Sequence, residues 1–181
     1  MEFVESAWSD DKEAMLEEIM NLYGKDIKRL LFTYTNNWSV AEDLTQEVFI
    51  TVYKKIDQFQ GKSSMRTWIY AIAINKCKDY FRSWHYKKVI LKEKINKPRL
   101  DYPKTPQQIL QTKEHYHEIM NCIKELPMKY KEVLLLHYYF DLSLKEIEEA
   151  LQIKGETAKT RLRRGREKLK LSLRRRGLND V

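Results

Sequence analysis

The chain has 181 residues, a formal net charge of +8 and 43% hydrophobic residues. This composition excludes a disordered protein, and the length suits one large or two small domains. The five glycines and four prolines are few, which favours an all-α fold. The N-terminal residues do not resemble a signal peptide, and no apolar run reaches the roughly 18 residues of a membrane span.

Acidic and basic segments alternate along the chain. Residues 1–60 and 105–158 are net acidic, whereas residues 61–104 and 159–181 are net basic. A polyanion bound at two basic segments, with acidic surfaces left for a protein partner, fits this pattern.

The first segments predict a loose acidic leader over residues 1–11 and then two short helices. Apolar residues repeat at helical spacing over residues 12–23 and again over residues 25–34. Both segments are interpreted as ordinary core helices.

Residues 39–59 predict an amphipathic helix that begins with a capping box of Ser39 and Glu42. Its apolar arc includes Leu44 and Phe49. Its opposite arc contains Asp43, Gln46, Glu47, Ile50 and Lys54. An ordinary solvated face fits such an arc, so the spacing alone does not indicate an interface, and the isoleucine in its middle is only a weak sign of one.

Residues 60–66 predict a polar loop, and residues 67–86 predict a helix rich in aromatic side chains. One narrow stripe of that helix is polar and contains Asn75, Lys78 and Arg82, with Trp68 at its loop end. Aromatic rings beside amide and basic groups suit unstacked bases. A solvated stripe fits as well, and most of the aromatic residues are expected in the core.

Residues 89–108 break the helical pattern, because Pro98, Pro103 and Pro106 exclude a continuous helix. We therefore predict a basic linker between a domain at residues 1–88 and a domain at residues 109–181. Within the second domain, helices are expected from residue 109 to 125 and from residue 128 to 139.

Residues 143–176 predict a helix-turn-helix. Ser143 and Glu146 form a capping box, residues 152–155 form the turn, and a longer basic helix follows. The buried stripe of this second helix is predicted to contain Ala158, Leu162, Leu169 and Leu173. Such a helix enters the major groove of DNA with its first residues at base edges. A solvated basic helix is the alternative, although this cluster of charge repels itself without an anion nearby.

Signatures of catalysis and metal binding are absent from the sequence. It contains no glycine-rich phosphate loop, no nucleophile elbow and no zinc-protease motif. His115, His117 and Cys122 lack the spacing of metal ligands. Cys77 and Cys122 are expected to be buried free thiols in a cytoplasmic protein. We therefore expect no enzyme, no cofactor, no metal and no small-molecule substrate.

Three segments together resemble an extracytoplasmic-function (ECF) sigma factor, the small two-domain class of the sigma-70 family. The first is AEDLTQEVFITVYKKIDQF (residues 41–59), which is similar to the polymerase-binding helix of that family. The second is SSMRTWIYAIAINKCKDYFR (residues 63–82), which is similar to its S-x-F-R-T-W-L-Y segment. The third, residues 126–169, resembles its L-P segment and helix-turn-helix. Their order, on either side of a proline-containing linker, makes the resemblance specific.

The resemblance implies a promoter-specificity subunit of bacterial RNA polymerase that needs no catalysis. It implies that the helix at residues 41–59 docks on the β′ coiled coil through Asp43, Leu44, Gln46, Glu47, Phe49 and Ile50. The implied contacts to the −10 element, including capture of a flipped base, are Lys62, Ser63, Ser64, Met65, Arg66, Trp68, Asn75, Lys78 and Arg82. The implied contacts to the −35 element are Ser143, Lys145, Lys154, Glu156, Thr157, Lys159, Thr160, Arg161, Arg163, Arg164 and Arg166.

The partners implied by the resemblance are the β′ and β subunits of core polymerase, promoter DNA and an anti-sigma factor anchored in the membrane. Three positions depart from the family pattern. Met65 replaces a common aromatic residue, which would alter base capture, and Glu148 replaces a small residue in the first helix of the helix-turn-helix. Gly165 replaces alanine, which should weaken the recognition helix by about 1 kcal/mol.

Two other functions fit parts of the sequence. The first is a free-standing helix-turn-helix regulator, which binds duplex DNA but has no use for a polymerase-binding face at residues 41–59. The second is an enzyme that modifies nucleic acid, for which the sequence supplies no active site.

Overall fold

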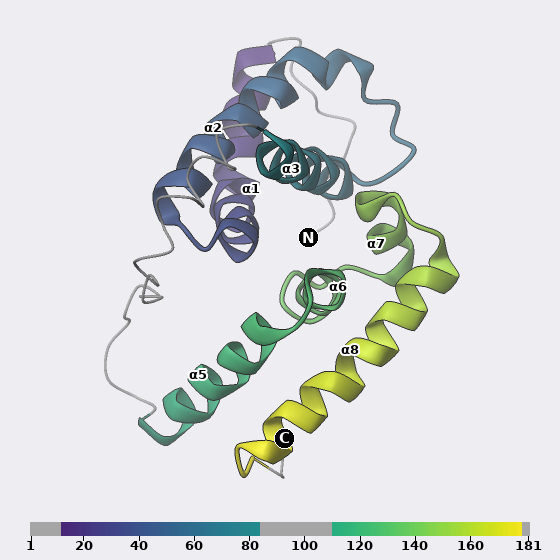
Figure 1. Ribbon diagram of the computed structural model, residues 1–181. Helices are drawn as coiled ribbons and strands as arrows, with labels where there is room; N and C mark the ends of the chain where they lie inside the picture. Colours follow the sequence, from purple (N-terminus) through teal and green to yellow (C-terminus); the bar gives the residue numbers. More distant parts are fainter. Residues whose placement is uncertain (1–11, 84–109, 179–181) are drawn as a thin grey trace. The chain divides into compact units, whose positions relative to one another are not determined.

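The computed structural model describes residues 12–83 and 110–178 (Figure 1). All regular structure in these ranges is helical, which confirms the predicted all-α fold. The chain divides into two compact units, residues 1–99 and 100–181. The predicted leader, the linker at residues 89–108 and both predicted domain boundaries lie outside the described residues. None of the helices in the described ranges is long and apolar enough to cross a membrane.

The first unit begins with one long helix, α1 (Lys12–Thr35), where the sequence predicted two. Ile19 and Ile27 are both fully buried, so the apolar stripe continues past Gly24 without a change of register. Glycine weakens a helix interior by about 1 kcal/mol, which is less than the packing of this stripe contributes. The predicted break was therefore wrong.

The second helix, α2 (Trp38–Lys55), begins one residue after Asn37 and not at the predicted capping box. The Asn37 side chain accepts hydrogen bonds from the backbone N–H groups of Ser39 and Val40, at 3.0 and 3.3 Å. Ser39 therefore lies inside the helix, and the Glu42 carboxylate forms an ion pair with Lys28 at 2.6 Å. A short 3-10 turn, η2 (Ile56–Gln58), follows α2.

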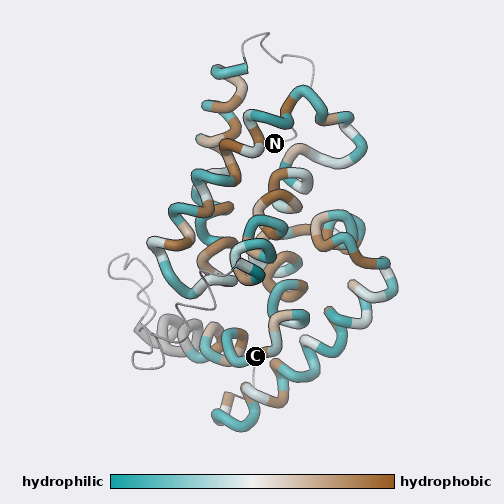
Figure 2. The backbone as a smooth tube through the Cα atoms, turned by 45° about the horizontal axis from the view of Figure 1, so that its top comes forward, coloured by the Kyte–Doolittle hydropathy of each residue, from teal (hydrophilic) through white to brown (hydrophobic). Residues whose placement is uncertain are grey.

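The third helix, α3 (Met65–Arg82), begins two residues earlier than predicted because Ser64 caps it. The Ser64 hydroxyl accepts a hydrogen bond from the Thr67 N–H at 3.1 Å. The last residues of the predicted helix, 84–86, lie outside the described residues. Helices α1, α2 and α3 pack on one another. Brown apolar and teal polar residues alternate along them, as expected of helices with one buried side (Figure 2).

We expect the free energy of unfolding to fall as the pH rises above about 9. Burial raises the pKa of the Cys77 thiol from 9.0 to about 12, and burial also raises the pKa of Tyr70 to about 12. The unfolded chain loses these protons at lower pH. The stabilisation that they supply is therefore complete below the unfolded pKa values and is lost as the pH rises towards 12.

Urea unfolding at about pH 8 and about pH 10.5 measures this loss. The Cys77→Ser variant, whose hydroxyl does not ionise in this range, should lose less stability between the two pH values than the unchanged protein. Equal losses in the two proteins would show that the Cys77 thiol does not contribute.

The second unit contains α5 (Leu110–Glu125), α6 (Met128–Tyr138), α7 (Leu144–Leu151) and α8 (Gly155–Arg175). Helices α7 and α8 form the predicted helix-turn-helix, and the capping box of Ser143 and Glu146 is present. Gln152 ends α7 in the left-handed conformation, with φ of 55°. Gly155, predicted in the turn, is instead the first residue of α8.

The buried side of α8 packs on α6. Ala158, Leu162 and Leu173 are buried as predicted, whereas Leu169 of the same stripe is partly exposed. A Cβ atom added at Gly165 would lie 3.2 Å from side-chain carbons of Leu134, so this glycine allows a close approach of α6 and α8. The low helix propensity of glycine predicted only a weaker helix at this position and did not indicate the close packing.

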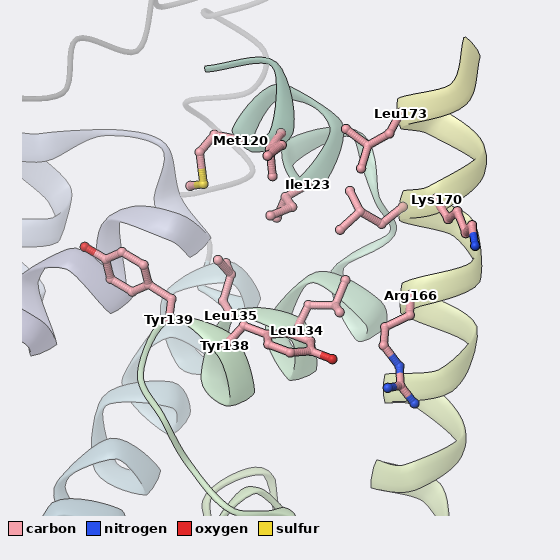
Figure 3. A pocket seen from close by; sticks show the side chains of 11 residues that line it. Met120, Ile123, Leu134, Leu135, Tyr138, Tyr139, Arg166, Lys170 and Leu173 are labelled. Carbon is pink, nitrogen blue, oxygen red and sulfur yellow. The ribbon is translucent and has the colours of Figure 1, made fainter. Parts of the chain in front are cut away.

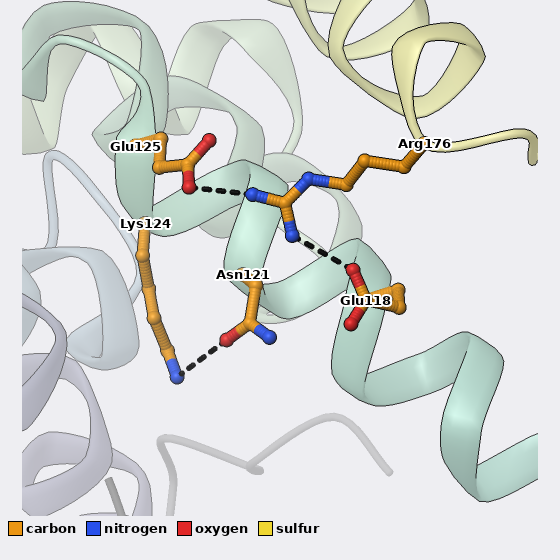
Figure 4. Close-up of polar contacts among 5 residues, drawn as sticks. All are labelled: Glu118, Asn121, Lys124, Glu125 and Arg176. Carbon is orange, nitrogen blue, oxygen red and sulfur yellow. Dashed lines mark hydrogen bonds and ion pairs between the residues drawn. The ribbon is translucent and has the colours of Figure 1, made fainter. Parts of the chain in front are cut away.

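The C-terminal end of α8 is tied to α5 by one arginine. The Arg176 guanidinium donates to Glu118 at 2.7 Å and to Glu125 at 2.5 Å (Figure 4). These two ion pairs hold α5 beside the last turns of α8. Helix α8 of the helix-turn-helix therefore also packs on α5 and α6.

Candidate nucleic-acid and protein interfaces

Helix α2 presents one face to solvent. The Ile50 side chain is 54% exposed at the middle of this face. The other exposed residues of the face are Asp43, Gln46, Glu47 and Lys54. We call these five residues the α2 face. Glu47 of this face forms an ion pair with Lys76 of α3, at 3.3 Å.

Two of the predicted polymerase contacts do not lie on the α2 face. Leu44 and Phe49 are only 4% and 5% exposed, because about 100° per residue places them on the inner arc of the helix. Their side chains belong to the core of the unit.

The residues predicted to contact the −10 element lie on the loop before α3 and on one side of that helix. Lys62 and Ser64 are exposed, and Ser63 is partly exposed. Asn75 and Lys78 are also partly exposed, and Arg82 is exposed beyond them. The loop and the predicted polar stripe are thus both accessible to a nucleic-acid strand.

Three residues of this predicted group have inward or structural contacts. Met65 is 6% exposed as the first residue of α3, so its side chain is not displayed by the loop. The Arg66 guanidinium lies 5.6 Å from the Tyr70 ring centroid, as a cation–π contact. The Trp68 ring lies 5.3 Å from the ring of Phe59, which fixes the loop end of the stripe.

The residues predicted to contact the −35 element gather at the start of α8 and around α7. The exposed ones are Ser143, Lys145, Lys154, Glu156, Lys159, Arg163, Arg164 and Arg166. Thr157 and Thr160 are partly exposed. The Ser143 side chain is also engaged in the capping box, where its hydroxyl donates to Glu146 at 2.8 Å. A basic surface therefore surrounds the first turns of α8, which is the arrangement that a major groove requires.

Arg161 differs from the other arginines because it is tied to α6. Its guanidinium donates to the Glu132 carboxylate at 3.1 Å, and the two side chains are 27% and 10% exposed. Arg163, by contrast, pairs with Glu167 along the exposed side of α8 at 2.6 Å. Arg161 thus fixes α8 on α6, and only a minor part of its surface remains for DNA.

Replacing Arg161 with alanine should lower the free energy of unfolding by about 2 kcal/mol, because it removes the guanidinium beside a mostly buried carboxylate. The control is Arg163→Ala, whose exposed ion pair should be worth less than about 0.5 kcal/mol. Urea unfolding measures both. Equal losses in the two variants would contradict the structural role of Arg161.

The second unit also has an apolar pocket that the sequence did not reveal (Figure 3). Its volume is about 520 Å³, and side chains from α5, α6 and α8 converge on it. Ile123, Leu134, Leu169 and others form its wall, while Arg166 and Lys170 lie at its edge on α8. The sequence of each helix alone has the pattern of an ordinary amphipathic segment. The pocket forms only when these helices pack together.

Each of the two units matches a known family model. The family model described as Sigma-70 region 2 matches residues 19–85, and the one described as Sigma-70, region 4 matches residues 116–169. The first covers most of α1 and all of α2 and α3, and the second covers α6, α7 and most of α8. These ranges include the segments that carried the resemblance in the sequence.

Curated relatives match along nearly the whole chain. The ECF RNA polymerase sigma factor SigW of Bacillus subtilis (strain 168) is 34% identical over 171 residues, covering 91% of each chain. The ECF RNA polymerase sigma factor SigM of the same organism is 32% identical over 169 residues, covering 91% of this chain and 98% of SigM. A free-standing regulator is not favoured by these relatives.

Solved structures share the fold. The sigma factor RpoE of Bartonella quintana, solved with the anti-sigma factor NepR, superposes with a TM-score of 0.69 over 87% of this chain and 96% of RpoE, at 17% identity. CnrH, solved with the cytosolic domain of CnrY, gives a TM-score of 0.64 over 91% of this chain and 90% of CnrH, at 17% identity. With both regions and full-length relatives matched, the chain belongs to the ECF sigma factors of the sigma-70 family and is an RNA polymerase sigma factor.

Proposed function

We propose that this sigma factor divides its work among three surfaces. The α2 face binds the β′ subunit of core polymerase, the loop before α3 binds the −10 element, and α7 with α8 binds the −35 element. In this proposal the first domain is residues 1–88, the linker is residues 89–108 and the second domain is residues 109–181. The observation that carries the proposal is the exposure of Asp43, Gln46, Glu47 and Ile50 on one helix face.

The three surfaces suggest how DNA opens without catalysis. The start of α8 holds duplex DNA through base edges and phosphates. Lys62, Ser63 and Ser64 then take one base out of the stack, while Asn75, Lys78 and Arg82 hold the separated strand. Unstacking a base costs a few kcal/mol, which phosphate contacts and a binding pocket can offset. Because Met65 is buried, this proposal does not give it a contact with the base.

The apolar pocket of the second unit supports a further polymerase contact. We propose that it receives an apolar helix of the β subunit, since a groove lined by Ile123, Leu134 and Leu169 suits such a helix. Arg166 and Lys170 at its edge favour acidic residues beside the apolar ones. The Leu169→Glu variant should then weaken binding of the isolated β subunit, and undiminished binding would contradict this contact.

Regulation by an anti-sigma factor is part of the proposal, because RpoE was solved with the anti-sigma factor NepR and CnrH with the cytosolic domain of CnrY. We propose a cytoplasmic location and an anti-sigma partner that is anchored in the membrane and covers the polymerase- and DNA-binding surfaces. Repeated purification of the tagged protein from native cells should recover this partner. Failure to recover one would weaken this part of the proposal.

Proteins of this family are not known as enzymes, and the proposed mechanism assigns no catalytic group. Permanganate, which oxidises unpaired thymines, tests the strand separation. Reactive thymines should appear upstream of the start site only when the protein, core polymerase and promoter fragment are all present. Strand opening by the protein alone, or transcription without any reactive thymine near the −10 element, would overturn the assigned roles.

A further inference from the structure

The turn between α7 and α8 brings a carboxylate against a glycine. Gly155 is the first residue of α8, and a Cβ atom in its place would lie 2.7 Å from Oε2 and 3.4 Å from Cδ of Glu148. One of the two groups would have to shift, and because Oε2 is the end of a flexible side chain, the Glu148 carboxylate would move more readily than the main chain of α8. The Glu148 side chain, which is partly buried, therefore occupies the space that any other residue at position 155 would need.

The Glu148 carboxylate lies beside the N-terminal end of α8. The first N–H groups of a helix have no acceptor within the helix and form the positive end of its dipole. Lys154, the N-cap residue of α8, provides no side-chain hydrogen bond to them. A negative charge at this position stabilises the helix end.

Glu148 also holds the turn through its main chain. Its carbonyl oxygen accepts a hydrogen bond from the N–H of Ile153 at 3.1 Å. One residue of α7 is thus bonded to the turn and in contact with the start of α8. The first turn of α8, with Glu156 and Thr157, is set relative to α7 by these two contacts.

We propose that Glu148 and Gly155 are a matched pair that positions the first turn of the recognition helix and thereby determines base selectivity at the −35 element. A shift of about 1 Å would take Glu156 and Thr157 out of hydrogen-bond reach of base edges. Glu148 is here a positioning residue and not a base contact. This inference rests on the proposed role of α8 in DNA binding.

A double-mutant cycle on the full-length protein tests the pairing. The probes are a duplex selected from a random pool by the unchanged protein and a scrambled duplex of the same length, both at one salt concentration. The readout is selectivity, which is the affinity for the selected duplex divided by that for the scrambled one. Gly155→Ala should lower it about threefold, because the added methyl group moves the Glu148 carboxylate away from the end of α8. Glu148→Ala and Glu148→Ala/Gly155→Ala should each lower it by the same amount and no more, because the carboxylate is already lost in both.

Two further variants sharpen the test. Gly165→Ala is the control: its added methyl group would meet Leu134, so its effect should be the same with and without Glu148. Glu148→Gln keeps the shape without the charge, so it should fold and lower selectivity by about threefold. An unchanged selectivity in Glu148→Gln would overturn the role of the charge.

The remaining outcomes separate this inference from the proposed function. Equal effects of Gly155→Ala with and without Glu148 would overturn the pairing. Coupling of the pair in urea unfolding alone, with selectivity never affected, would overturn its part in recognition. If Arg164→Ala leaves all duplex binding unchanged while the pair still couples in unfolding, the proposed DNA role of α8 fails and the contact itself stands as structural only.

Discussion

Replacing Asp43 with arginine and Gln46 with alanine should reduce core-polymerase binding, and with it transcription, by at least about 100-fold. Both side chains are exposed on the α2 face, so the folded unit does not depend on them. Exposed substitutions change the free energy of unfolding by less than about 0.5 kcal/mol. Charge reversal in the middle of an interface, in contrast, costs several kcal/mol. Binding of duplex DNA by the helix-turn-helix should be unchanged.

A matched control lies in the same unit. Glu18→Arg with Asn21→Ala makes the same two kinds of change on exposed positions of α1. This control should bind core polymerase as well as the unchanged protein does, measured by co-elution or fluorescence anisotropy. Equal losses in both double variants, or full transcription by the Asp43→Arg/Gln46→Ala protein, would contradict the assignment of the α2 face.

Replacing Arg164 with alanine should weaken binding to a −35 duplex by about tenfold and reduce the salt slope by about one unit. Arg164 is exposed near the start of α8, opposite the stripe of Ala158 and Leu162 that packs on α6. A side chain in that position meets DNA when the helix enters the major groove. Its loss removes a phosphate or guanine contact without disturbing the core.

Arg174→Ala is the control for this prediction. Arg174 is an equally exposed arginine of the same helix, ten residues or about 15 Å further along its axis. It should leave the affinity within about twofold, because only the first turns of a recognition helix reach base edges. Fluorescence anisotropy at several salt concentrations measures both variants. A salt-independent affinity, or equal losses from the two arginines, would exclude the proposed docking.

Helix starts and exposed faces were predicted correctly from the sequence where the local signal agrees with the packing of the folded unit. The capping box at Ser143 starts α7 as expected, and the alternation of apolar and polar residues in α2 produced its exposed face. Two helix starts were predicted at the wrong residue, because a residue that precedes the predicted start caps each helix. Asn37, and not Ser39, satisfies the first N–H groups of α2, and Ser64 begins α3 two residues early.

Several predicted site residues have structural contacts, because family motifs mix contact residues with residues that hold them in place. Leu44, Phe49 and Met65 belong to the core, and Arg161 is bound to Glu132. For Leu44 and Phe49, the helical spacing of the sequence had already placed both side chains on the apolar arc. The ion pair of Arg161 joins residues 29 positions apart, and the apolar pocket needs three helices. Neither of these leaves a periodic signal within one segment.

The most direct measurement is run-off transcription from fragments of the source genome, using bacterial core polymerase with and without this protein. We predict new start sites that appear only with the protein, and upstream sequences that align into common −35 and −10 elements. Specific binding to duplex DNA without any new start site would contradict the central claim, because the chain would then act on DNA without directing polymerase.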